Sequence, residues 1–178
     1  ANRASACVPT PLPSLNDMTG GGLCGAFAEV GGPPGAGKTQ FCLHLAALCA
    51  VEGGEVFWLD TERTFTPPRV LELIEAICRS RSAAGADSAG SAEMESPALS
   101  ALRRIRRRVC SSLHEVHAVI AELVQHAQQG EALPALVIVD SIAAVARNEG
   151  DPGANRRDYI PRRQAALNAL ASLSKVLV

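Results

Sequence analysis

Residues 31–40 read GGPPGAGKTQ, and few local structures accommodate a stretch so rich in glycine and proline. A short apolar run, residues 26–30, precedes it and is expected to form a buried strand. An apolar helix is predicted over residues 38–51, where a glycine pair ends it. Glycines let the backbone turn its N–H groups inward, and a helix N-terminus adds partial positive charge. A strand, a glycine-rich loop and a helix in this order predict a cradle for phosphate groups.

The stretch satisfies the pattern G-x-x-x-x-G-K-[ST]. Lys38 is one of only two lysines, beside fifteen arginines. Its compact ammonium can reach between β- and γ-phosphate oxygens, whereas the planar guanidinium of arginine does not fit such a cradle. The hydroxyl of Thr39 is expected to bind Mg²⁺. The residues of this stretch that are expected to bind nucleotide are Gly32, Pro33, Pro34, Gly35, Ala36, Gly37, Lys38, Thr39 and Gln40.

A dinucleotide site is the alternative for a glycine-rich loop with an acid near position 60, because that acid could hold a ribose. Residues 37–39, Gly-Lys-Thr, would be superfluous in such a site, and G-x-G-x-x-G is not cleanly present. We therefore set the dinucleotide alternative aside in favour of a triphosphate.

An acid closes the most apolar run of the chain. Residues 135–140 read ALVIVD, the pattern of a strand buried on both faces. Asp140 is expected to be the second Mg²⁺ partner beside Thr39, with an acidic helix cap as the alternative role. Many P-loop ATPases place a glutamate directly after this aspartate, but Ser141 stands there.

The carboxylate that orients the attacking water must then follow a neighbouring strand. Residues 55–60 read EVFWLD and predict a strand, and Glu62 comes shortly after it. Glu62 is therefore the candidate for this catalytic role, with an exposed loop acid as its alternative. Asp60 is expected to be held by backbone hydrogen bonds or to be directed at Thr61.

Strands and helices alternate along the chain, which predicts an α/β fold with a mostly parallel sheet and helices on both faces. Residues 66–67, Thr-Pro, are typical of a helix start, and residues 103–111 suit a short strand with a basic lead. A capping box opens a helix predicted over residues 112–128. A last helix is expected to begin at Pro161.

Residues 31–39, 60–62 and 140–141 each follow a predicted strand. Strand-to-helix loops of a parallel sheet lie at one edge, where ligands bind. These three segments are therefore expected to meet at that edge.

The chain is expected to consist of a turn-rich lead-in, residues 1–25, and one core, residues 26–178. Within the core, a disordered insertion is predicted at 80–101, because serine, alanine and glycine dominate there and large apolar side chains are few. Residues 147–157 are expected to form a polar loop.

The amino-acid composition limits which binding partners and which cellular compartment are expected for the chain. The net charge is −1, so bulk electrostatics does not draw the chain to nucleic acid or membrane, and no apolar run is long enough to span a bilayer. The six cysteines are expected to be free, buried thiols in a reducing compartment. His114 and His117 share a helix face, but no third ligand stands near, so no metal site is expected there.

Three segments, GGPPGAGKTQFC, VFWLDTERTFTPPRVLELI and LVIVDSIAAVARNE, resemble the ATPase core of the RecA-type recombinases. The eukaryotic and archaeal strand-exchange branch is the nearest match. Within it, the Pro-Pro of the loop and the following Gln-Phe-Cys are similar to the recombinase paralogues, most of all the B paralogue. The resemblance implies a RecA-like P-loop NTPase core that is C-terminally incomplete, since the family's second DNA loop and last strands would follow Val178.

The resemblance also implies residue roles. Lys38 and Glu62 would be catalytic, with Glu62 activating water, and Arg69 would stack on adenine. Asp140 would be the family's magnesium aspartate. The loop from 147 to 163 falls where the family's first DNA-binding loop lies, so the candidates for contacts with DNA phosphates are Arg156, Arg157 and Arg162.

The implied function is an ATP-binding, DNA-dependent ATPase subunit of a recombinase paralogue complex, acting in homologous-recombination repair of double-strand breaks in the nucleus. ATP and Mg²⁺ are the expected cofactors, and single-stranded DNA and other paralogue subunits the expected partners. A non-hydrolysing, nucleotide-dependent assembly subunit and a RecA-fold ATPase outside recombination are the alternatives. Arg63 departs from the family pattern, and its guanidinium could pair with Glu62 or point to solvent.

Overall fold

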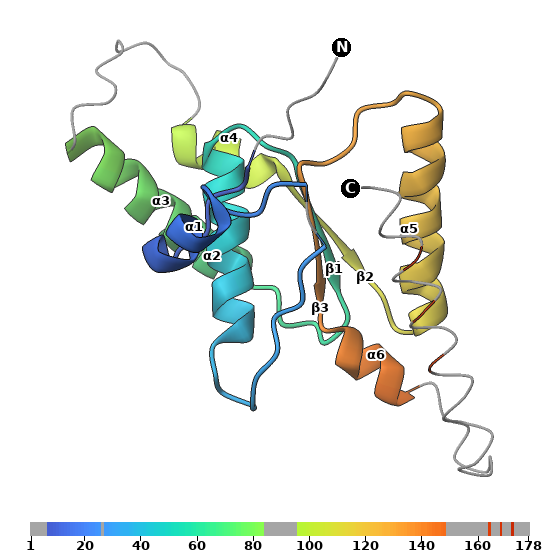
Figure 1. Cartoon of the computed structure of the whole chain (residues 1–178). Helices are drawn as coiled ribbons and strands as arrows, with labels where there is room; N and C mark the ends of the chain where they lie inside the picture. The colour runs from blue at the N-terminus through green and yellow to red at the C-terminus, as the bar shows by residue number, and fades with distance from the viewer. Residues whose placement is uncertain are drawn as a thin grey trace. The chain divides into compact units, whose positions relative to one another are not determined.

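The computed structural model describes residues 7–25, 27–83 and 96–148, together with helical residues 164, 168 and 172. Within these ranges three strands form one sheet in the order β2-β1-β3, and helices connect them (Figure 1). The strands are β1 (Val56–Asp60), β2 (Ile105–Val109) and β3 (Leu136–Asp140). The helices are α1 (Pro13–Thr19), α2 (Lys38–Val51), α3 (Pro67–Ala83), α4 (Pro97–Arg103), α5 (Leu113–Gln128) and α6 (Ile142–Asn148).

The strands run parallel, as their flanking hydrogen bonds show. Val56 N–H donates to the Arg104 carbonyl at 2.9 Å where β1 and β2 begin, and Cys110 N–H donates to the Asp60 carbonyl at 3.0 Å where they end. Two equivalent bonds join the starts and the ends of β1 and β3. Parallel neighbours need crossover connections, which the intervening helices supply. The α/β fold with a parallel sheet is confirmed.

Burial decreases from the central strand outward. Trp58, Leu59 and Asp60 of β1 are fully buried, whereas β2 is exposed over most of its length. The prediction that residues 135–140 are buried on both faces is wrong for part of β3, because its side chains alternate between half-buried and buried. β3 ends the strand order, so within the described residues it has a neighbouring strand on one side only.

The chain forms two compact units. Among the described residues, one unit comprises those within 1–57, 65–106 and 134–138, and the other those within 58–64, 107–133 and 139–178. In the first unit α2, α3 and α4 pack against one another, and in the second α5 contacts α6. The glycine-rich loop belongs to the first unit, and Glu62 and Asp140 belong to the second.

Helix boundaries follow the local signals in the sequence. α2 spans the predicted residues 38–51, and Gly53 takes a left-handed φ of 89° just after it. α3 begins at Pro67 as predicted. At the start of α5 the Ser112 hydroxyl accepts a hydrogen bond from Glu115 N–H at 3.1 Å, while the Glu115 carboxylate accepts one from Ser111 N–H at 2.7 Å. The capping box is confirmed, with the reciprocal bond one residue earlier than the standard pattern.

The strand predicted at residues 26–30 is not formed over 27–30, which has no regular secondary structure. Phe27 and Val30 are 57% and 45% exposed. A strand needs neighbours to take up its backbone hydrogen bonds, and no strand in the described part of the chain pairs with this segment. The apolar run therefore marks an unpaired segment, and the prediction of a buried strand there was wrong.

The insertion predicted at 80–101 is corrected at both ends. Residues 80–83 complete α3, and residues 97–101 belong to α4, which starts at a proline suited to the first turn of a helix. The small residues there pack well in helices: Ala98 and Ala101 are buried. The stretch between the two helices lies outside the described residues.

The polar loop predicted at residues 147–157 begins later than expected, because Arg147 and Asn148 are the last turn of α6. The remainder of that loop and the start of the helix predicted at Pro161 lie outside the described residues. No helix in the described ranges is both long enough and apolar enough to cross a membrane.

Cys7 and Cys24 form a disulfide, so the prediction that the six cysteines are free, buried thiols is wrong for this pair. Both are exposed, and they flank an antiparallel bridge between Val8 and Leu23 that holds their backbones together. The remaining four cysteines form no disulfide, and Cys49 and Cys110 among them are buried. Sequence spacing alone could not pair two cysteines whose backbones are brought together by a bridge between their neighbours, Val8 and Leu23.

Candidate nucleotide-binding site

The glycine-rich loop is built around a tight turn. Ala36 N–H donates to the Pro33 carbonyl at 3.2 Å, closing a four-residue turn with Pro34 and Gly35 at its centre. Gly35 has a φ of 78°, which is the requirement for the third position of a type II turn, and proline suits the second. Gly37 caps α2 with a φ of 86°. A side chain at either glycine would be strained, so the loop shape depends on both.

Lys38 lies over this loop. Its ammonium donates to the carbonyl oxygens of Gly32 and Pro33, both at 2.9 Å. Lys38 is also the first residue of α2, a helix whose N-terminal N–H groups favour an anion. The ammonium and the helix N-terminus therefore sit at the same short stretch of chain, as the motif predicts.

Two clefts border the loop. One, of about 370 Å³, is lined by Leu12, Leu15, Glu29, Val30, Gly31, Ala36, Gly37, Lys38 and Phe41. The other, of about 290 Å³, is lined by Gly35, Gly37, Lys38, Thr39 and Gln40. Gly37 and Lys38 line both clefts.

Arg69 lies beside the start of α2. Its Nε donates to the Gln40 side-chain oxygen at 3.3 Å, and its Nη1 pairs with Glu72 at 2.8 Å. The two residues come from α3 and α2, helices that pack together in the first unit. The structure thus joins Arg69 to Gln40, two residues predicted separately to bind nucleotide.

In the second unit, the ends of β1 and β3 meet. Thr61 N–H donates to the Asp140 carbonyl at 3.0 Å, and the Thr61 hydroxyl donates to the Ser141 carbonyl at 2.7 Å. The Ser141 hydroxyl donates to the Glu62 carboxylate at 2.5 Å. The predicted meeting of residues 60–62 with 140–141 is confirmed. Whether the glycine-rich loop joins them stays a prediction, since it lies in the other unit.

Glu62 has its carboxylate partners on the β3 side. Besides Ser141, the Arg147 guanidinium lies 4.0 Å from the same carboxylate oxygen, and the Glu62 side chain remains 42% exposed. Arg63 has a φ of 58° and is exposed, and no ion pair joins it to Glu62 within the described residues. Of the two orientations left open for Arg63, the structure has the one toward solvent.

Asp140 is buried at the end of β3, and the Thr64 hydroxyl lies 3.5 Å from its carboxylate. An oxygen ligand fixed by buried backbone is suited to a hard cation such as Mg²⁺. Thr39, the other predicted metal ligand, lies in the first unit at the start of α2. Their joint use as a metal site stays a prediction.

Asp60 is a buried acid whose partner sequence analysis missed. Its carboxylate accepts a hydrogen bond from the Thr64 backbone N–H at 3.1 Å, which confirms the expected backbone contact, and another from Arg107 Nε at 2.9 Å. Arg107 comes from the neighbouring strand, 47 residues away in sequence. The run Arg106-Arg107-Arg108 could have indicated this partner. Successive side chains of a strand point to opposite faces, so Arg107 lies on the opposite face from Arg106 and Arg108.

Replacing Arg107 with alanine is expected to lower the free energy of unfolding by about 2–3 kcal/mol, because it leaves the Asp60 carboxylate buried without its cation. This loss in the free energy of unfolding is smaller than the loss expected for a fully buried ion pair, because the Arg107 side chain is 36% exposed. Arg106→Ala and Arg108→Ala are matched controls. These arginines pair with Glu55 and Glu122 at the surface, and each loss should cost below about 1 kcal/mol.

Urea unfolding of the three variants measures the difference. Adding Asp60→Asn to Arg107→Ala should recover part of the loss, because the buried charge is then gone. Equal losses in all three arginine variants would contradict the assignment of the Asp60 pair as the stabilising one.

Arg156, Arg157 and Arg162, predicted to contact DNA phosphates, lie outside the described residues. The remaining predicted site residues are placed: the glycine-rich loop, Gln40 and Arg69 in the first unit, and Glu62 and Asp140 in the second.

The sequence was compared with known proteins. A family model described as AAA domain matches residues 3–176. DNA repair protein RAD51 homolog 2 of Mus musculus is 32% identical over 185 residues, which cover 99% of this chain and 49% of the mouse protein. The protein of the same name in Homo sapiens is 29% identical over 184 residues, 96% of this chain and 44% of its own length.

The match to another relative covers a shorter segment of the chain. DNA repair and recombination protein RadA of Methanocorpusculum labreanum is 35% identical over 75 residues, covering 38% of this chain and 23% of that protein. The chain spans about half the length of the RAD51 homolog 2 proteins that it matches.

Proposed function

Because the chain belongs to the AAA domain family, we propose that it binds ATP and hydrolyses it in response to single-stranded DNA, as one subunit of a recombinase paralogue complex. The complex would repair double-strand breaks by homologous recombination in the nucleus. The expected resemblance to the recombinase paralogues, most of all the B paralogue, is confirmed by the similarity to RAD51 homolog 2. The repair role, the partners and the compartment are carried over from that similarity as proposals.

The observation that carries the proposal is the position of the Lys38 ammonium over its own loop. It donates to two carbonyl oxygens, those of Gly32 and Pro33, which are weaker acceptors than the charged oxygens of a triphosphate. On binding, Lys38 would exchange these carbonyls for phosphate oxygens with little movement of the backbone. The N–H groups at the start of α2 would bind the same anion.

Mg²⁺ would be held by the Thr39 hydroxyl and the Asp140 carboxylate, and it would neutralise charge on the phosphates. Glu62 would orient a water molecule and take its proton as the water oxygen bonds to the γ-phosphorus and the bond to the ADP oxygen breaks. Arg69 would stack on the adenine. Ser141, which donates to Glu62, would keep that carboxylate in place.

Contacts with DNA phosphates are proposed for Arg156, Arg157 and Arg162, which follow α6 in sequence. Phosphate contacts position a protein on DNA without reading its sequence. No preference for a DNA sequence is therefore expected.

A second candidate is a subunit that binds ATP for assembly and hydrolyses little. One observation favours it: the Glu62 carboxylate already accepts a short hydrogen bond from Ser141 and lies near Arg147, so water would have to compete for it. In this case nucleotide would link neighbouring subunits without turnover.

The test uses the chain with ATP and Mg²⁺, with and without an oligothymidine. We expect saturable binding of a fluorescent ATP analogue and release of phosphate that rises severalfold with DNA. Saturable binding with no turnover under either condition, together with ATP-dependent association with a paralogue subunit, would favour the assembly role. Absence of nucleotide binding would refute both.

A further inference from the structure

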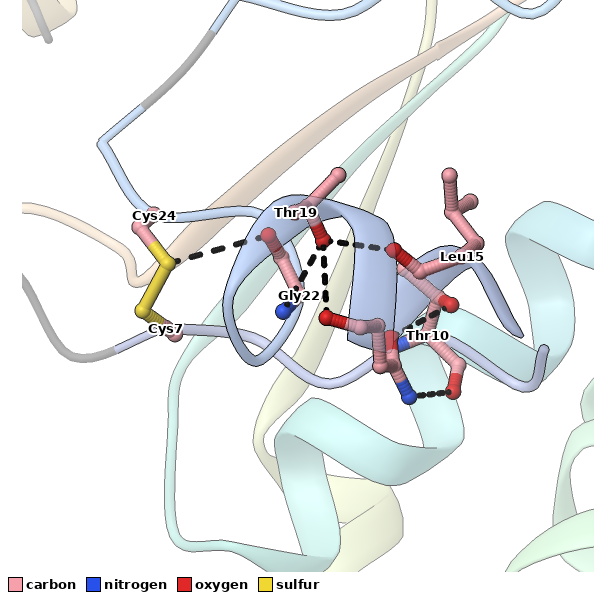
Figure 2. The surroundings of a disulfide bond; sticks show 7 residues. Cys7, Thr10, Leu15, Thr19, Gly22 and Cys24 are labelled. Carbon is pink, nitrogen blue, oxygen red and sulfur yellow. Dashed lines mark hydrogen bonds between the residues drawn. A yellow bond between two sulfur atoms is a disulfide. The ribbon is translucent and has the colours of Figure 1, made fainter. Parts of the chain in front are cut away.

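The disulfide between Cys7 and Cys24 closes a short segment, residues 7–24, which we call the N-terminal loop. Figure 2 shows the bond together with residues of this loop, namely Thr10, Leu15, Thr19 and Gly22. Both cysteines are exposed, so small thiols and disulfides can reach them. The proposed nuclear location is a reducing environment, in which an exposed disulfide is labile rather than permanent.

Two of the other described cysteines, Cys49 and Cys110, are buried and are poor competitors for oxidation. Burial, reinforced by the charge of Glu52, raises the pKa of Cys49 to about 11. Burial is also the main cause of the raised pKa of Cys110. A thiol with a raised pKa forms little thiolate, which is the reactive species. Oxidation under mild conditions should therefore favour the exposed pair, Cys7 and Cys24, over Cys49 and Cys110.

The N-terminal loop is internally organised. The Asn16 side chain accepts from Thr10 N–H at 2.8 Å and from the Thr10 hydroxyl at 2.7 Å, and its amide donates to the Thr10 carbonyl at 2.9 Å. α1 ends at Gly20, which takes a left-handed φ of 74°. With the cysteines joined, both ends of this small unit are fixed.

One side of the N-terminal loop borders the glycine-rich loop. Leu12 and Leu15 line the cleft of about 370 Å³ that is also lined by Gly37 and Lys38. Both belong to the first unit, and Leu15 lies on α1. The segment closed by the disulfide is thus one wall of a cleft beside the proposed phosphate site.

We propose that Cys7 and Cys24 are a reversible thiol–disulfide modification site, and that forming the bond fixes the Leu12 and Leu15 wall and raises the affinity of the chain for ATP. The effect on ATP and the reversibility in the cell rest on the proposed function; the pairing of Cys7 with Cys24 does not. The oxidant is a low-molecular-weight disulfide such as oxidised glutathione.

Glutathione disulfide oxidises the Cys7 and Cys24 thiols in two thiol–disulfide exchange steps. One protein thiolate attacks a sulfur of glutathione disulfide, forming a mixed disulfide and releasing one glutathione thiolate. The second protein thiolate attacks the protein sulfur of the mixed disulfide, forming the Cys7–Cys24 bond and releasing the second glutathione. Two protein thiols are oxidised and one glutathione disulfide is reduced to two thiols.

The coupling to ATP follows from conformational freedom. When the pair is reduced, the N-terminal loop is held by the Val8–Leu23 bridge, its internal hydrogen bonds and the burial of Val8 and Thr10, and binding must order it further. A cross-link removes that freedom before the ligand arrives, so less of the binding free energy is lost to ordering. We expect about fivefold tighter ATP binding in the oxidised form, at the low end of typical coupling between two sites.

The experiment equilibrates the chain in glutathione buffers from fully reduced to fully oxidised. Maleimide labelling under denaturing conditions with mass spectrometry locates the protected thiols, and a fluorescent ATP analogue with Mg²⁺ measures affinity. Hydrogen exchange compares residues 10–19 in the two states. We expect protection at Cys7 and Cys24 together, slower exchange over residues 10–19, and the fivefold change in affinity.

Cys7→Ser should bind ATP like the reduced chain in every buffer, whereas Cys78→Ser, which removes a free cysteine of α3, should keep the full response. Thiols at 7 and 24 that stay unpaired in all buffers would overturn the modification site. Equal or weaker affinity after oxidation would overturn the coupling. If neither form binds ATP, the proposed function fails, and the labelling and exchange data still decide the modification.

Discussion

Replacing Lys38 with alanine should weaken ATP binding roughly a hundredfold or more. The Lys38 ammonium lies over the loop within hydrogen-bond distance of the Gly32 and Pro33 carbonyls, where phosphate oxygens would take their place. Hydrogen bonds to charged groups contribute about 1.5–3 kcal/mol each, and every 1.4 kcal/mol is a tenfold change in affinity. Titration with a fluorescent ATP analogue in Mg²⁺ measures the loss.

Two variants sharpen this test. Lys38→Arg keeps the charge, but the planar guanidinium should not fit the cradle, so most of the loss should remain. Lys175→Ala removes the only other lysine of the chain and is the matched control for charge. Thermal unfolding should be nearly unchanged in Lys38→Ala, since both hydrogen bonds of this side chain are to its own loop. Wild-type affinity in Lys38→Ala would rule out the loop as the phosphate site.

Local signals in the sequence predicted α2, α3 and α5 because the causes of these helices are local, whereas α1, α4 and α6 were not predicted. The proline at residue 67 and the capping box at 112–115 act within one turn, so the helix starts could be read from neighbouring residues. The left-handed glycines that shape residues 31–37 are equally local. The start of α2 therefore agrees with prediction.

Features that depend on distant partners could not be predicted in this way. Residues 27–30 are apolar enough for a strand, but a strand exists only where another pairs with it. Asp60 is held by Arg107 from a neighbouring strand, a pairing that depends on the register of the sheet. The disulfide of Cys7 with Cys24 depends on a backbone bridge, and thiol oxidation depends on the surroundings as much as on sequence.

The assignment of Glu62 as the catalytic carboxylate depends on both local sequence and a distant partner. Glu62 was chosen because Ser141 occupies the position where many P-loop ATPases have their glutamate, and the structure brings these two residues together by a hydrogen bond of 2.5 Å. Both Glu62 and Ser141 could be identified from the sequence. Their contact required β1 and β3 to end side by side, which the parallel sheet provides.

Glu62→Gln should lower the rate of ATP hydrolysis by roughly two orders of magnitude while ATP affinity stays within about twofold, because general-base catalysis typically contributes that much or more. Glutamine keeps an oxygen that can accept from the Ser141 hydroxyl, so the local structure should be retained. It loses the negative charge and the ability to take a proton. Phosphate release at saturating ATP, with oligothymidine present, measures the change.

The controls separate charge from catalysis. Glu75→Gln neutralises an exposed carboxylate of α3 that pairs with Arg79, and it should leave hydrolysis unchanged. Ser141→Ala removes the donor to Glu62 without altering the carboxylate and should give an intermediate loss, because the base is then less well oriented. If Glu62→Gln hydrolyses ATP at the wild-type rate, another group activates the water. If both rates are negligible while ATP still binds, the carboxylate serves nucleotide-dependent assembly instead.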